Sequence, residues 1–356
     1  MTVRIAAVGY GDIAQRRHFP QLAELGGRAE LVAIAGRDAA RMAACAAQFG
    51  IPRWSTDVAS VVGDPGVDAV LVLTAPDTHL RFAEMAVAAG KHVLVEKPLV
   101  PSLAEAARLA AAVRARPVTF MALPFIETPD HVLAASLIAQ GAIGEVAAVE
   151  CHRGHKGPTH AGWFYDKAQA GGGVLADLGI YHLTSIATLF GGASRFTVSL
   201  STRFAERVLD DGTVVRPDVE DSALVSLVLE SGVAASMHAH WNGSQPHTAT
   251  RARVLVIGRE GSVYFGAADG AVHLWRPVGD GARFGGEEGM FDSLPVRSSK
   301  TAGGPAQIMR AFVERIERGD VSTRSLDVQA HVLEIIARSY EGGGQPIIPQ
   351  TRVFFL

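Results

Sequence analysis

Short apolar runs alternate with helical patterns along the first third of the chain. The apolar runs are residues 3–8, 31–35, 69–73, 92–95 and 118–122, and the helical patterns between them are 39–49, 58–62, 80–89 and 103–115. A short run that is apolar at nearly every position is typical of a strand buried on both faces of a parallel sheet. This alternation predicts an α/β domain of strand–helix–strand units over residues 1–122.

The pattern changes beyond residue 123. A helical pattern at 130–140 is followed by strand patterns at 144–153, 195–207, 221–230, 233–241, 250–258 and 261–266. Two of the connections, Ser231-Gly232 and Glu260-Gly261, are typical of hairpin turns. We therefore expect residues 123–356 to form an α+β domain with a mainly antiparallel open sheet and helices on one face.

The last part of the chain returns to helical patterns. Residues 279–304 are rich in glycine and charge, which predicts a mobile loop or an excursion at an interface. Two amphipathic helices are expected near 305–318 and 326–340. A chain of 356 residues fits two domains, each able to bury a core of its own.

Charge and cysteine content argue against several classes of protein. The net charge is -3, from 33 basic and 36 acidic residues without a basic run, so we expect no nucleic-acid partner. No stretch approaches the ~20 apolar residues of a membrane span, and no signal peptide is expected before the first strand. Cys45 and Cys151 form no pair motif, which argues against a disulfide framework. The expected location is the cytoplasm.

A glycine-rich turn follows the first strand. The sequence Gly9-Tyr10-Gly11-Asp12-Ile13-Ala14 matches the dinucleotide-binding turn, with alanine in its third position. Gly9 permits the tight turn and Gly11 lets the backbone approach a pyrophosphate, while the next helix offers unpaired amides to the anion. Asp12 and Ile13 are therefore candidate cofactor contacts, and the alternative is a turn with only a structural role.

The end of the second strand bears on the choice between NADP and NAD. NAD usually meets a carboxylate here, whereas an arginine accommodates the 2'-phosphate of NADP. Gly36 occupies the position of the acid and Arg37 follows it, with Arg41 one helical turn further on. This favours NADP, although Asp38 could turn inward and favour NAD. Thr74 and Pro76, after the third long strand, are candidates to line a ribose of the cofactor.

Glu96-Lys97-Pro98 directly follows the strand at 92–95. Open parallel sheets bind ligands beyond the carboxyl ends of their strands, so Lys97 is expected there, with Glu96 beside the cofactor. Pro98 keeps Lys97 out of helical geometry and fixes the direction of the chain. The alternative is an ordinary surface lysine, because lysine is almost always exposed.

A second motif, Gly171-Gly172-Gly173, opens a stretch to Phe190 that is apolar on nearly every side, as in a buried helix. Asp177 and Tyr181 are four residues apart and share one helical face, while His182 points about 100° away. Moving a hydride to or from a carbinol carbon requires a proton to move as well, and a phenol needs a nearby cation to serve near neutral pH. Lys97 is the candidate cation. The alternative is that Asp177 braces the helix and Tyr181 belongs to the core.

These motifs together resemble the Gfo/Idh/MocA family of oxidoreductases. The resemblance covers essentially the whole chain, through the Gly9-Tyr10-Gly11 turn, residues 89–98 and the run from Gly171 to Gly179. It implies a Rossmann domain followed by a domain whose open sheet commonly mediates dimers or tetramers. It also implies that Lys97 is catalytic.

The resemblance assigns further residues. Many members have histidine four residues after the helix aspartate, whereas this chain has Tyr181 there and His182 one later. This form resembles glucose-fructose oxidoreductase and the dimeric dihydrodiol dehydrogenases, where tyrosine is the proton donor, and residues 35–38 resemble the NADP-using branch. By family analogy residues 152–166 contribute to the substrate wall, with Arg153, Lys156, His160, Trp163 and Tyr165 as candidate contacts.

Histidines are frequent in the second part of the chain, but they do not predict a metal site. His152, His155 and His160 lack a carboxylate or cysteine that would complete a recognisable ligand set. His238 and His240 alternate on a strand and so face the same side of the sheet, where we expect a structural role.

The sequence thus predicts an NADP-dependent oxidoreductase, with NAD possible, that acts on a sugar, cyclitol or related hydroxy or keto compound. Lys97 would polarise the substrate oxygen, Tyr181 would transfer the proton and Asp177 would orient the pair, with His182 as the alternative proton carrier. A homodimer or homotetramer through the C-terminal sheet is expected. Two other functions fit the motifs: a glycosidase that oxidises its substrate transiently with tightly held NAD, and a non-catalytic nucleotide-binding regulator.

Overall fold

The computed structural model describes residues 2–124, 128–243, 252–266, 271–277, 289–295, 306–342, 346–351 and 353. The chain divides into two compact units, Met1–Glu127 with Ser299–Leu333, and Thr128–Ser298 with Glu334–Leu356. The sequence pattern placed one boundary at residue 122 and assigned everything beyond it to the second domain. The division differs because the segment that follows Ser299 returns to the first unit.

The first unit contains a parallel sheet in the order β3-β2-β1-β4-β5-β6. The strands are β1 (Val3–Val8), β2 (Ala29–Ala35), β3 (Trp54–Ser55), β4 (Ala69–Val72), β5 (His92–Val95) and β6 (Phe120–Ala122). This doubly wound order confirms the predicted Rossmann architecture. Its strand order reverses between β1 and β4, which is where such sheets bind ligands beyond the strand ends.

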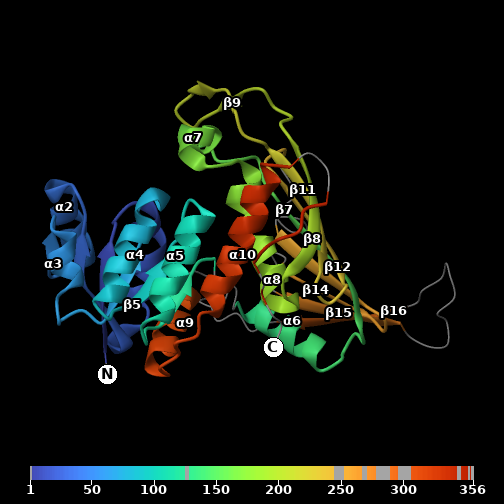
Figure 1. Cartoon of the computed structure of the whole chain (residues 1–356), viewed down its shortest axis with the longest axis horizontal. Coiled ribbons are helices and arrows are strands. Elements are labelled where there is room, and N and C mark those ends of the chain that lie inside the picture. Colours follow the sequence, from blue (N-terminus) through green and yellow to red (C-terminus); the bar gives the residue numbers. More distant parts are fainter. Residues whose placement is uncertain are drawn as a thin grey trace. The chain divides into compact units, whose positions relative to one another are not determined.

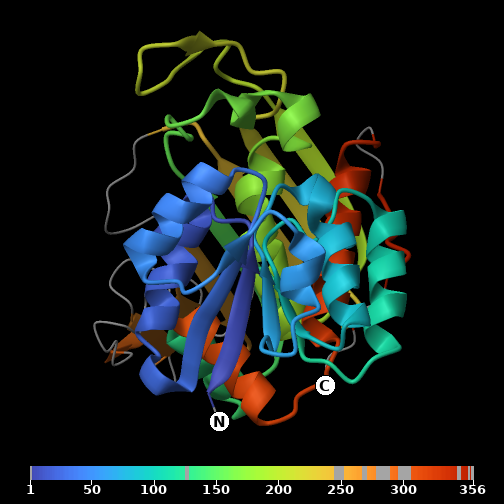
Figure 2. The ribbon, with the colours of Figure 1, turned by 90° about the vertical axis from the view of Figure 1, so that its left-hand side faces the viewer.

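Helices cover both faces of this sheet (Figure 2). They are η1 (Ala14–His18, a π-helix), α1 (Phe19–Ala23), η2 (Gly26–Arg28), α2 (Ala39–Phe49), α3 (Val58–Val62), η3 (Pro76–Thr78), α4 (His79–Ala88) and α5 (Leu103–Arg114), with α9 (Ala306–Glu317) and the first part of α10 (Arg324–Ser339). Successive residues of β1 face opposite sides: Ile5 and Ala7 join the core under α1, α2 and α9, whereas Ala6 and Val8 join the core under α3, α4 and α5. The apolar runs of the sequence are therefore buried on both faces.

Helix α9 explains why the first unit includes residues late in the chain. Its residues Met309, Phe312 and Val313 are fully buried in the same core cluster as Ile34. Arg28 forms an ion pair with Glu317 at 2.6 Å, and the Ser325 hydroxyl donates to the carbonyl of Phe120 at 3.2 Å. An amphipathic pattern predicts such a helix but does not report which sheet its apolar side will cover.

The second unit is built on an eight-stranded sheet in the order β16-β15-β14-β13-β7-β12-β11-β8. The strands are β7 (Val146–Gly154), β8 (Ala193–Ser201), β11 (Ser222–Leu229), β12 (Ala234–His240), β13 (Ala252–Gly258), β14 (Ser262–Phe265), β15 (Ala271–Pro277) and β16 (Gly289–Pro295). Neighbours pair antiparallel except β7 and β12, which are parallel. The predicted mainly antiparallel sheet and its two hairpins are confirmed.

The prediction of a loop over residues 279–304 is wrong where strand β16 lies, because Met290 pairs with Arg276 and the ladder continues to Pro295. Strand β15 was also missed. Both strands form through pairing of the backbone with a neighbour, which local composition does not report. Residues 279–288 and 296–304 lie outside the described part of the chain.

Helices of the second unit lie against one face of its sheet, among them α6 (Pro129–Ala139), η5 (Leu175–Gly179, a π-helix) and α8 (Ile180–Phe190) (Figure 1). The short helices η4 (Gly162–Tyr165) and α7 (Lys167–Ala170) contact each other. Helix α8 contacts β7 and β12, and η5 contacts β7, β11 and β12. Between β8 and β11 the short strands β9 (Arg207–Val208) and β10 (Val214–Val215) pair with each other.

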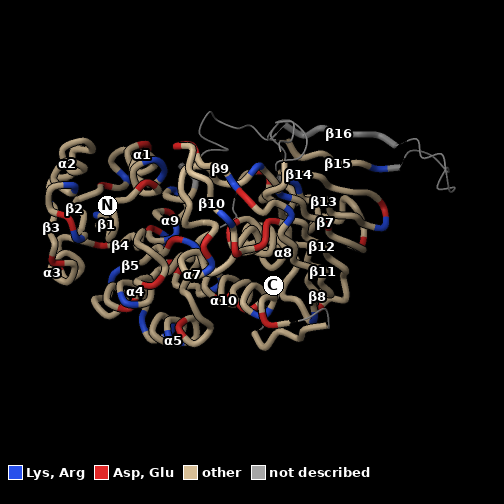
Figure 3. Tube along the Cα trace, turned by 90° about the horizontal axis from the view of Figure 1, so that it is seen from above, with Lys and Arg blue, Asp and Glu red and all other residues tan. Residues whose placement is uncertain are grey.

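Residues Lys167–Phe190 are, by length and composition, apolar enough to cross a membrane. Within their most apolar window, 67% is buried inside the protein, as in the core helix of a soluble protein, so this is weak evidence for a span. Basic and acidic residues are interspersed along both units (Figure 3).

Candidate functional site

The glycine turn after β1 has the geometry that its sequence predicts. Gly9 has φ +99°, and a β-carbon there would lie 2.6 Å from the carbonyl oxygen of Leu73, so no other residue fits without strain. The amide of Gly9 donates to Ala35 at 3.0 Å, which holds the turn between β2 and β4. Gly11 is exposed, with open space where a β-carbon would point. A pyrophosphate could therefore approach the backbone at Gly11 and the first amides of the helix.

The residues after this turn point to solvent. Asp12 forms an ion pair with Arg16 at 2.7 Å, and both side chains are largely exposed. Ile13 is 37% exposed, which is unusual for an isoleucine at the start of a helix that packs on a sheet. The backbone amides at the start of the helix and the exposed Ile13 side chain are compatible with a bound dinucleotide.

The Tyr10 ring limits which side chains fit at residue 36, at the end of β2. A β-carbon at Gly36 would lie 2.3 Å from the Tyr10 ring, so an acidic side chain does not fit beside it. The carboxylate of Asp38 caps α2 by accepting the amide of Arg41 at 3.0 Å, and its carbonyl accepts from the Tyr10 hydroxyl at 3.2 Å. The Arg37 and Arg41 side chains are exposed. The position that carries the ribose-binding acid in NAD enzymes is therefore filled by an aromatic ring.

The turns after β4 and β5 are tied together by His79, the first residue of α4. This side chain is fully buried, with Nδ1 2.9 Å from the carbonyl oxygen of Pro98 and Nε2 3.0 Å from that of Thr74. His79 thus both begins α4 and joins the backbone of the two turns. Thr74 is also bonded to Thr78, at 2.7 Å between their hydroxyl oxygens, and Pro76 opens η3.

Lys97 lies directly after β5, half-buried, and its peptide bond to Pro98 is cis. Glu96 is buried and uses both carboxylate oxygens within the unit, one 2.7 Å from His18 Nε2 and the other accepting the Lys97 amide at 2.8 Å. Burial disfavours the charged form of Glu96, but the bonds from His18 and from the Lys97 amide outweigh it and lower its pKa. Glu96, expected beside the cofactor, is thus engaged in fixing the backbone of Lys97, and His18 is a partner that sequence reasoning missed.

Tyr181 and Asp177 are both half-buried on the helix that follows the glycines. The guanidinium carbon of Arg153, on β7, lies 4.4 Å from the centre of the Tyr181 ring. A cation at this distance over an aromatic face is an attractive contact. The structure therefore brings together Arg153, expected at the substrate, and Tyr181, expected to carry the proton.

His182 has a different environment from Tyr181. It is 4% exposed, and its Nε2 lies 2.9 Å from the carbonyl oxygen of His152. Burial first, and then the charge of Arg153, lower its pKa to about 3. A neutral, buried imidazole bonded to the backbone has the surroundings of a core residue.

The other candidates for the substrate wall separate into two groups. Trp163 is 47% exposed and stacks on Phe164 with ring centres 3.8 Å apart, and His160 packs on the edge of Phe164 at 5.3 Å. Tyr165, by contrast, is buried, and its hydroxyl donates to the carbonyl of Pro158 at 2.7 Å. The structure thus gives the Tyr165 hydroxyl a local partner within this loop.

Three histidines gather on the face of the second sheet opposite to α8. The rings of His152, His238 and His240 have centres 5.1 to 5.6 Å apart, and Nε2 of His240 lies 3.2 Å from Nε2 of His152. The Ser222 hydroxyl is 3.3 Å from His238 Nε2. Within the described residues, no group of three or more His, Cys, Asp or Glu side chains is arranged to hold a metal ion.

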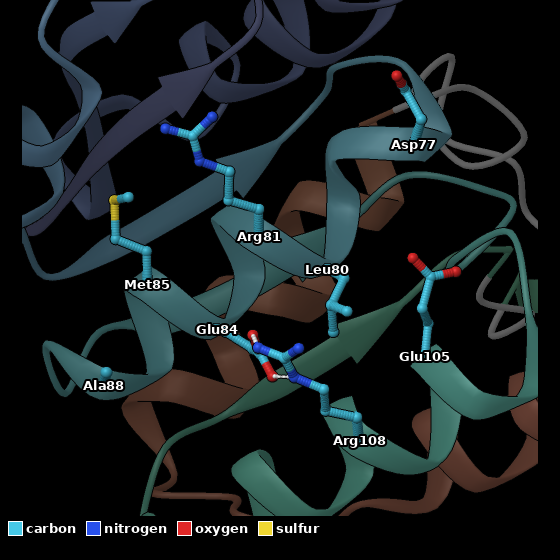
Figure 4. Close-up of a pocket in the computed structure, with 8 residues that line it drawn as sticks. All are labelled: Asp77, Leu80, Arg81, Glu84, Met85, Ala88, Glu105 and Arg108. Atoms are coloured by element: carbon cyan, nitrogen blue, oxygen red, sulfur yellow. Dashed lines mark hydrogen bonds and ion pairs between the residues drawn. The ribbon is translucent and has the colours of Figure 1, made fainter.

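A cavity of about 470 Å³ lies along α4 and α5 (Figure 4). Its lining residues are Asp77, Leu80, Arg81, Glu84, Met85, Ala88, Glu105 and Arg108. Arg108 and Glu84 are paired with each other at 2.6 Å, and none of the residues expected from the sequence to bind cofactor or substrate lines this cavity.

Two family models match this chain. A model described as "Oxidoreductase family, NAD-binding Rossmann fold" matches residues 3–123, and the GFO/IDH/MocA C-terminal domain matches residues 131–264. The chain belongs to the Gfo/Idh/MocA family of oxidoreductases. The resemblance inferred from the glycine turn, the Glu96-Lys97-Pro98 segment and the second glycine motif is confirmed.

Relatives within this family carry several different names. The chain is 31% identical over 237 residues to 1,5-anhydro-D-fructose reductase of Ensifer adhaerens, covering 66% of this chain and 68% of that protein. It is 35% identical over 187 residues to trans-1,2-dihydrobenzene-1,2-diol dehydrogenase of Bos taurus, covering 52% of this chain and 55% of the relative.

Solved structures of the family share the fold at lower identity. A levoglucosan dehydrogenase without ligands has a TM-score of 0.85 at 20% identity, covering 99% of this chain and all (100%) of that one. A variant of a 3-ketoreductase from Actinomadura kijaniata, in complex with TDP-benzene and NADP, has a TM-score of 0.73 at 24% identity, covering 96% and 98%. These likenesses show that the Gfo/Idh/MocA architecture spans both units.

The burial of His182 predicts an acid-sensitive stability. Its pKa is about 3 in the folded chain and 6.5 when unperturbed, so below pH 6.5 the unfolded chain binds a proton that the folded chain does not. Stability is therefore lost as the pH falls from 6.5 towards 3, by about 2 kcal/mol at pH 5. In urea unfolding, His182→Gln should lose less stability than the wild type between pH 7.5 and pH 5. The exposed His160→Gln should behave as the wild type, and an unchanged pH dependence in His182→Gln would contradict the assignment.

Proposed function

We propose that this protein is an NADP-preferring oxidoreductase that moves a hydride between nicotinamide and a hydroxyl-bearing or keto carbon of a sugar, cyclitol or related compound. The observation that carries the proposal is the Tyr181 phenol, half-buried one turn after the glycine motif with the Arg153 guanidinium 4.4 Å from its ring. Membership of an oxidoreductase family with an NAD-binding Rossmann fold supports it.

Each residue has a separate part in the proposed chemistry. Lys97 binds the reacting oxygen of the substrate through its ammonium group and favours negative charge there. Tyr181 gives a proton to this oxygen in reduction and takes it in oxidation. Asp177, on the same helix, orients the phenol and the substrate hydroxyls. The bound nicotinamide supplies or accepts the hydride.

Arg153 and His182 support the assignment of the proton to Tyr181. The guanidinium of Arg153 restricts the tilt of the Tyr181 ring and places positive charge near the phenol. His182 is buried against the backbone of His152, with a pKa of about 3, and so is neutral near pH 7. We therefore assign proton transfer to Tyr181 and a structural part to His182.

The proposed substrate class rests on the exposed aromatic surface and on the names of relatives. Trp163, stacked on Phe164, offers a broad apolar face, against which the C–H groups of a sugar ring can pack. Two matched relatives are named as a 1,5-anhydro-D-fructose reductase and a trans-1,2-dihydrobenzene-1,2-diol dehydrogenase. We propose that Arg153, His160 and Trp163 contact a polyhydroxylated substrate.

The preference for NADP rests on the end of β2. Tyr10 fills the space that an acid at Gly36 would need, and Asp38 is occupied as the cap of α2. Two exposed arginines, Arg37 and Arg41, remain to pair with a 2'-phosphate. In this arrangement the Asp38 carboxylate is engaged by the amide of Arg41, which makes it a weaker partner for the ribose hydroxyls of NAD.

We also propose that the chain assembles with copies of itself through the face of the second sheet opposite to α8. Leu224 on β11 is 47% exposed on this face, whereas its neighbours Ala223 and Val225 are fully buried on the other. Half-buried Leu255 and Ile257 on β13 point to the same side as Leu224. Exposed and half-buried apolar side chains on this face fit a second copy, which would present the same residues.

The catalytic assignment is tested with Lys97→Met and Tyr181→Phe. Each should lower kcat by about 100-fold or more, because each removes a group that stabilises or moves charge on the substrate oxygen. Cofactor affinity, measured by NADPH fluorescence, should stay within a few-fold. Turnover is measured with 1,5-anhydro-D-fructose and NADPH and with levoglucosan and NADP, following absorbance of the reduced nicotinamide.

A matched control for Lys97→Met is Lys91→Met, at the opposite end of β5. The Lys91 ammonium donates to the carbonyls of Asp64 and Val67 and should affect stability but not turnover. Full activity of Lys97→Met would overturn the mechanism. Release of a free sugar from a glycoside without net change in nicotinamide absorbance would favour a glycosidase instead.

The cofactor assignment is tested with Arg37→Ala. Loss of a charge-assisted bond to the 2'-phosphate should raise the Kd for NADPH by about tenfold or more and leave the Kd for NADH within twofold. Arg116→Ala, an exposed arginine just before β6, serves as the control and should change neither value. Equal weakening of NADPH and NADH by Arg37→Ala would count against the NADP preference.

Self-association is tested with Leu224→Arg, which places a charge on this face, on the strand next to the sheet edge. The mass in solution, measured by light scattering, should fall from a dimer or tetramer to a smaller species, because an unpaired charge is costly to bury in an interface. Val321→Arg changes an exposed apolar residue of the first unit and should keep the mass of the wild type. A wild-type monomer, or an unchanged mass for Leu224→Arg, would contradict this interface.

A further inference from the structure

A buried carboxylate touches the start of the helix that carries Asp177 and Tyr181. Glu220, two residues before β11, is 8% exposed. One of its carboxylate oxygens accepts the amide of Gly173 at 3.1 Å, and the other accepts the amide of Leu175 at 2.9 Å and the hydroxyl of Tyr340 at 2.9 Å. Its backbone carbonyl accepts the amide of Val174 at 3.1 Å. Glu220 thus holds three successive amides of this turn.

The helix needs this partner because its own sequence supplies none. Val174, at the cap position before η5, makes no side-chain capping bond. The first amides of a helix have no acceptor within the helix, and buried amides without acceptors are costly. A carboxylate at this end also interacts favourably with the helix dipole. Glu220, 47 residues further along the chain than Gly173, therefore caps this helix.

Two glycines of the second motif make room for this contact. A β-carbon at Gly173 would lie 2.0 Å from the carbonyl oxygen of Glu220, and one at Gly172 would lie 2.2 Å from the Tyr340 hydroxyl. Gly171 has a separate reason, since it ends α7 with φ +76°. Gly172 and Gly173 are thus required because Glu220 and Tyr340 approach so closely. We call the hydrogen-bonded pair Glu220 and Tyr340 the helix anchor.

Tyr340 keeps the anchor hydrogen-bonded across the working pH range. Burial, and then the charge of Glu220, raise the pKa of Tyr340 far above its ordinary value. Its hydroxyl therefore remains a donor to the Glu220 carboxylate. The bond joins the end of α10 to the start of the reactive helix within the second unit.

We propose that Glu220, supported by Tyr340, is a positioning residue of this oxidoreductase, which fixes the first turn of the helix and so the place of the Tyr181 phenol. The path is short, because Gly173 is held through its amide by Glu220 and accepts the amide of Asp177 at 3.0 Å, four residues before Tyr181. The inference rests on the proposed function, in which Tyr181 transfers the proton. Displacement of a reacting group by about 1 Å can cost about 100-fold in rate.

The test is Glu220→Gln, which keeps the shape of the side chain but removes its charge and one acceptor. With 1,5-anhydro-D-fructose and NADPH, kcat should fall by about 10- to 100-fold, while KM and the Kd for NADPH stay within about threefold. The pH at which kcat is half-maximal should also shift, because the phenol no longer meets the substrate oxygen in the same geometry. Unchanged kcat with an unchanged pH profile, in a folded protein, would overturn the inference.

Glu334→Gln is the matched control. Glu334 is also buried and accepts the amides of Gln350 and Thr351 at 2.5 and 2.6 Å, but it holds the C-terminal segment instead of the reactive helix. It should lower the melting temperature as Glu220→Gln does and leave kcat and its pH profile unchanged. An equal fall of kcat in both variants would mean that Glu220 acts only through stability, and would overturn the inference.

Two further variants separate the possible failures. If Glu220→Gln does not fold, Tyr340→Phe decides, because it removes one bond of the anchor, and we expect kcat to fall about three- to tenfold with the same shift in pH profile. Tyr181→Phe tests the proposed function itself. Full turnover by Tyr181→Phe overturns that function and this inference together, whereas loss by Tyr181→Phe with wild-type kcat in the anchor variants overturns the inference alone.

Discussion

The parallel sheet of the first unit must be covered on both faces, and this constraint arranges the rest of the unit. Ile5 and Ala7 need one layer of helices while Ala6 and Val8 need another, so the helices after β1 and β2 cover one face and those after β3, β4 and β5 cover the other. Each connection to a helix starts at the carboxyl end of a strand, where the backbone must turn without a sheet partner. The turn at Gly9, the capped end at Asp38 and the segment at Lys97 all lie in such connections. The candidate residues of the first unit therefore lie at strand ends, where the backbone has no partner in the sheet.

Local pattern was sufficient for most elements and insufficient for a few. Helix α2 was predicted from residue 39 to 49, and the residues that bound it, Asp38 and Gly50, lie next to the helical pattern itself. Strand β16 was missed because it forms by pairing with β15, and the return of α9 to the first unit was missed because Phe312 joins a core formed some 280 residues earlier. Propensity and periodicity describe a segment alone, whereas these outcomes depend on a distant neighbour.

The candidate site shows the same contrast between residues predicted from local pattern and residues that depend on distant partners. Lys97 and Tyr181 were predicted because each stands in a motif of a few residues. His18 and Tyr340 were not, because they reach Glu96 and Glu220 from 78 and 120 positions away and stand in no motif. Two motif residues were interpreted differently once their partners were known: Glu96 braces the backbone, and Tyr165 is bonded within its own loop. Motifs identify residues that meet a ligand more readily than residues that meet each other.

The contact between Tyr10 and Gly36 has a consequence for substitutions at the end of β2. Any side chain introduced at residue 36 would require the Tyr10 ring to move from its place. Moving the ring would also break the hydrogen bond from the Tyr10 hydroxyl to the carbonyl of Asp38. The two positions are therefore coupled, and the effect of a substitution at residue 36 depends on the residue at position 10.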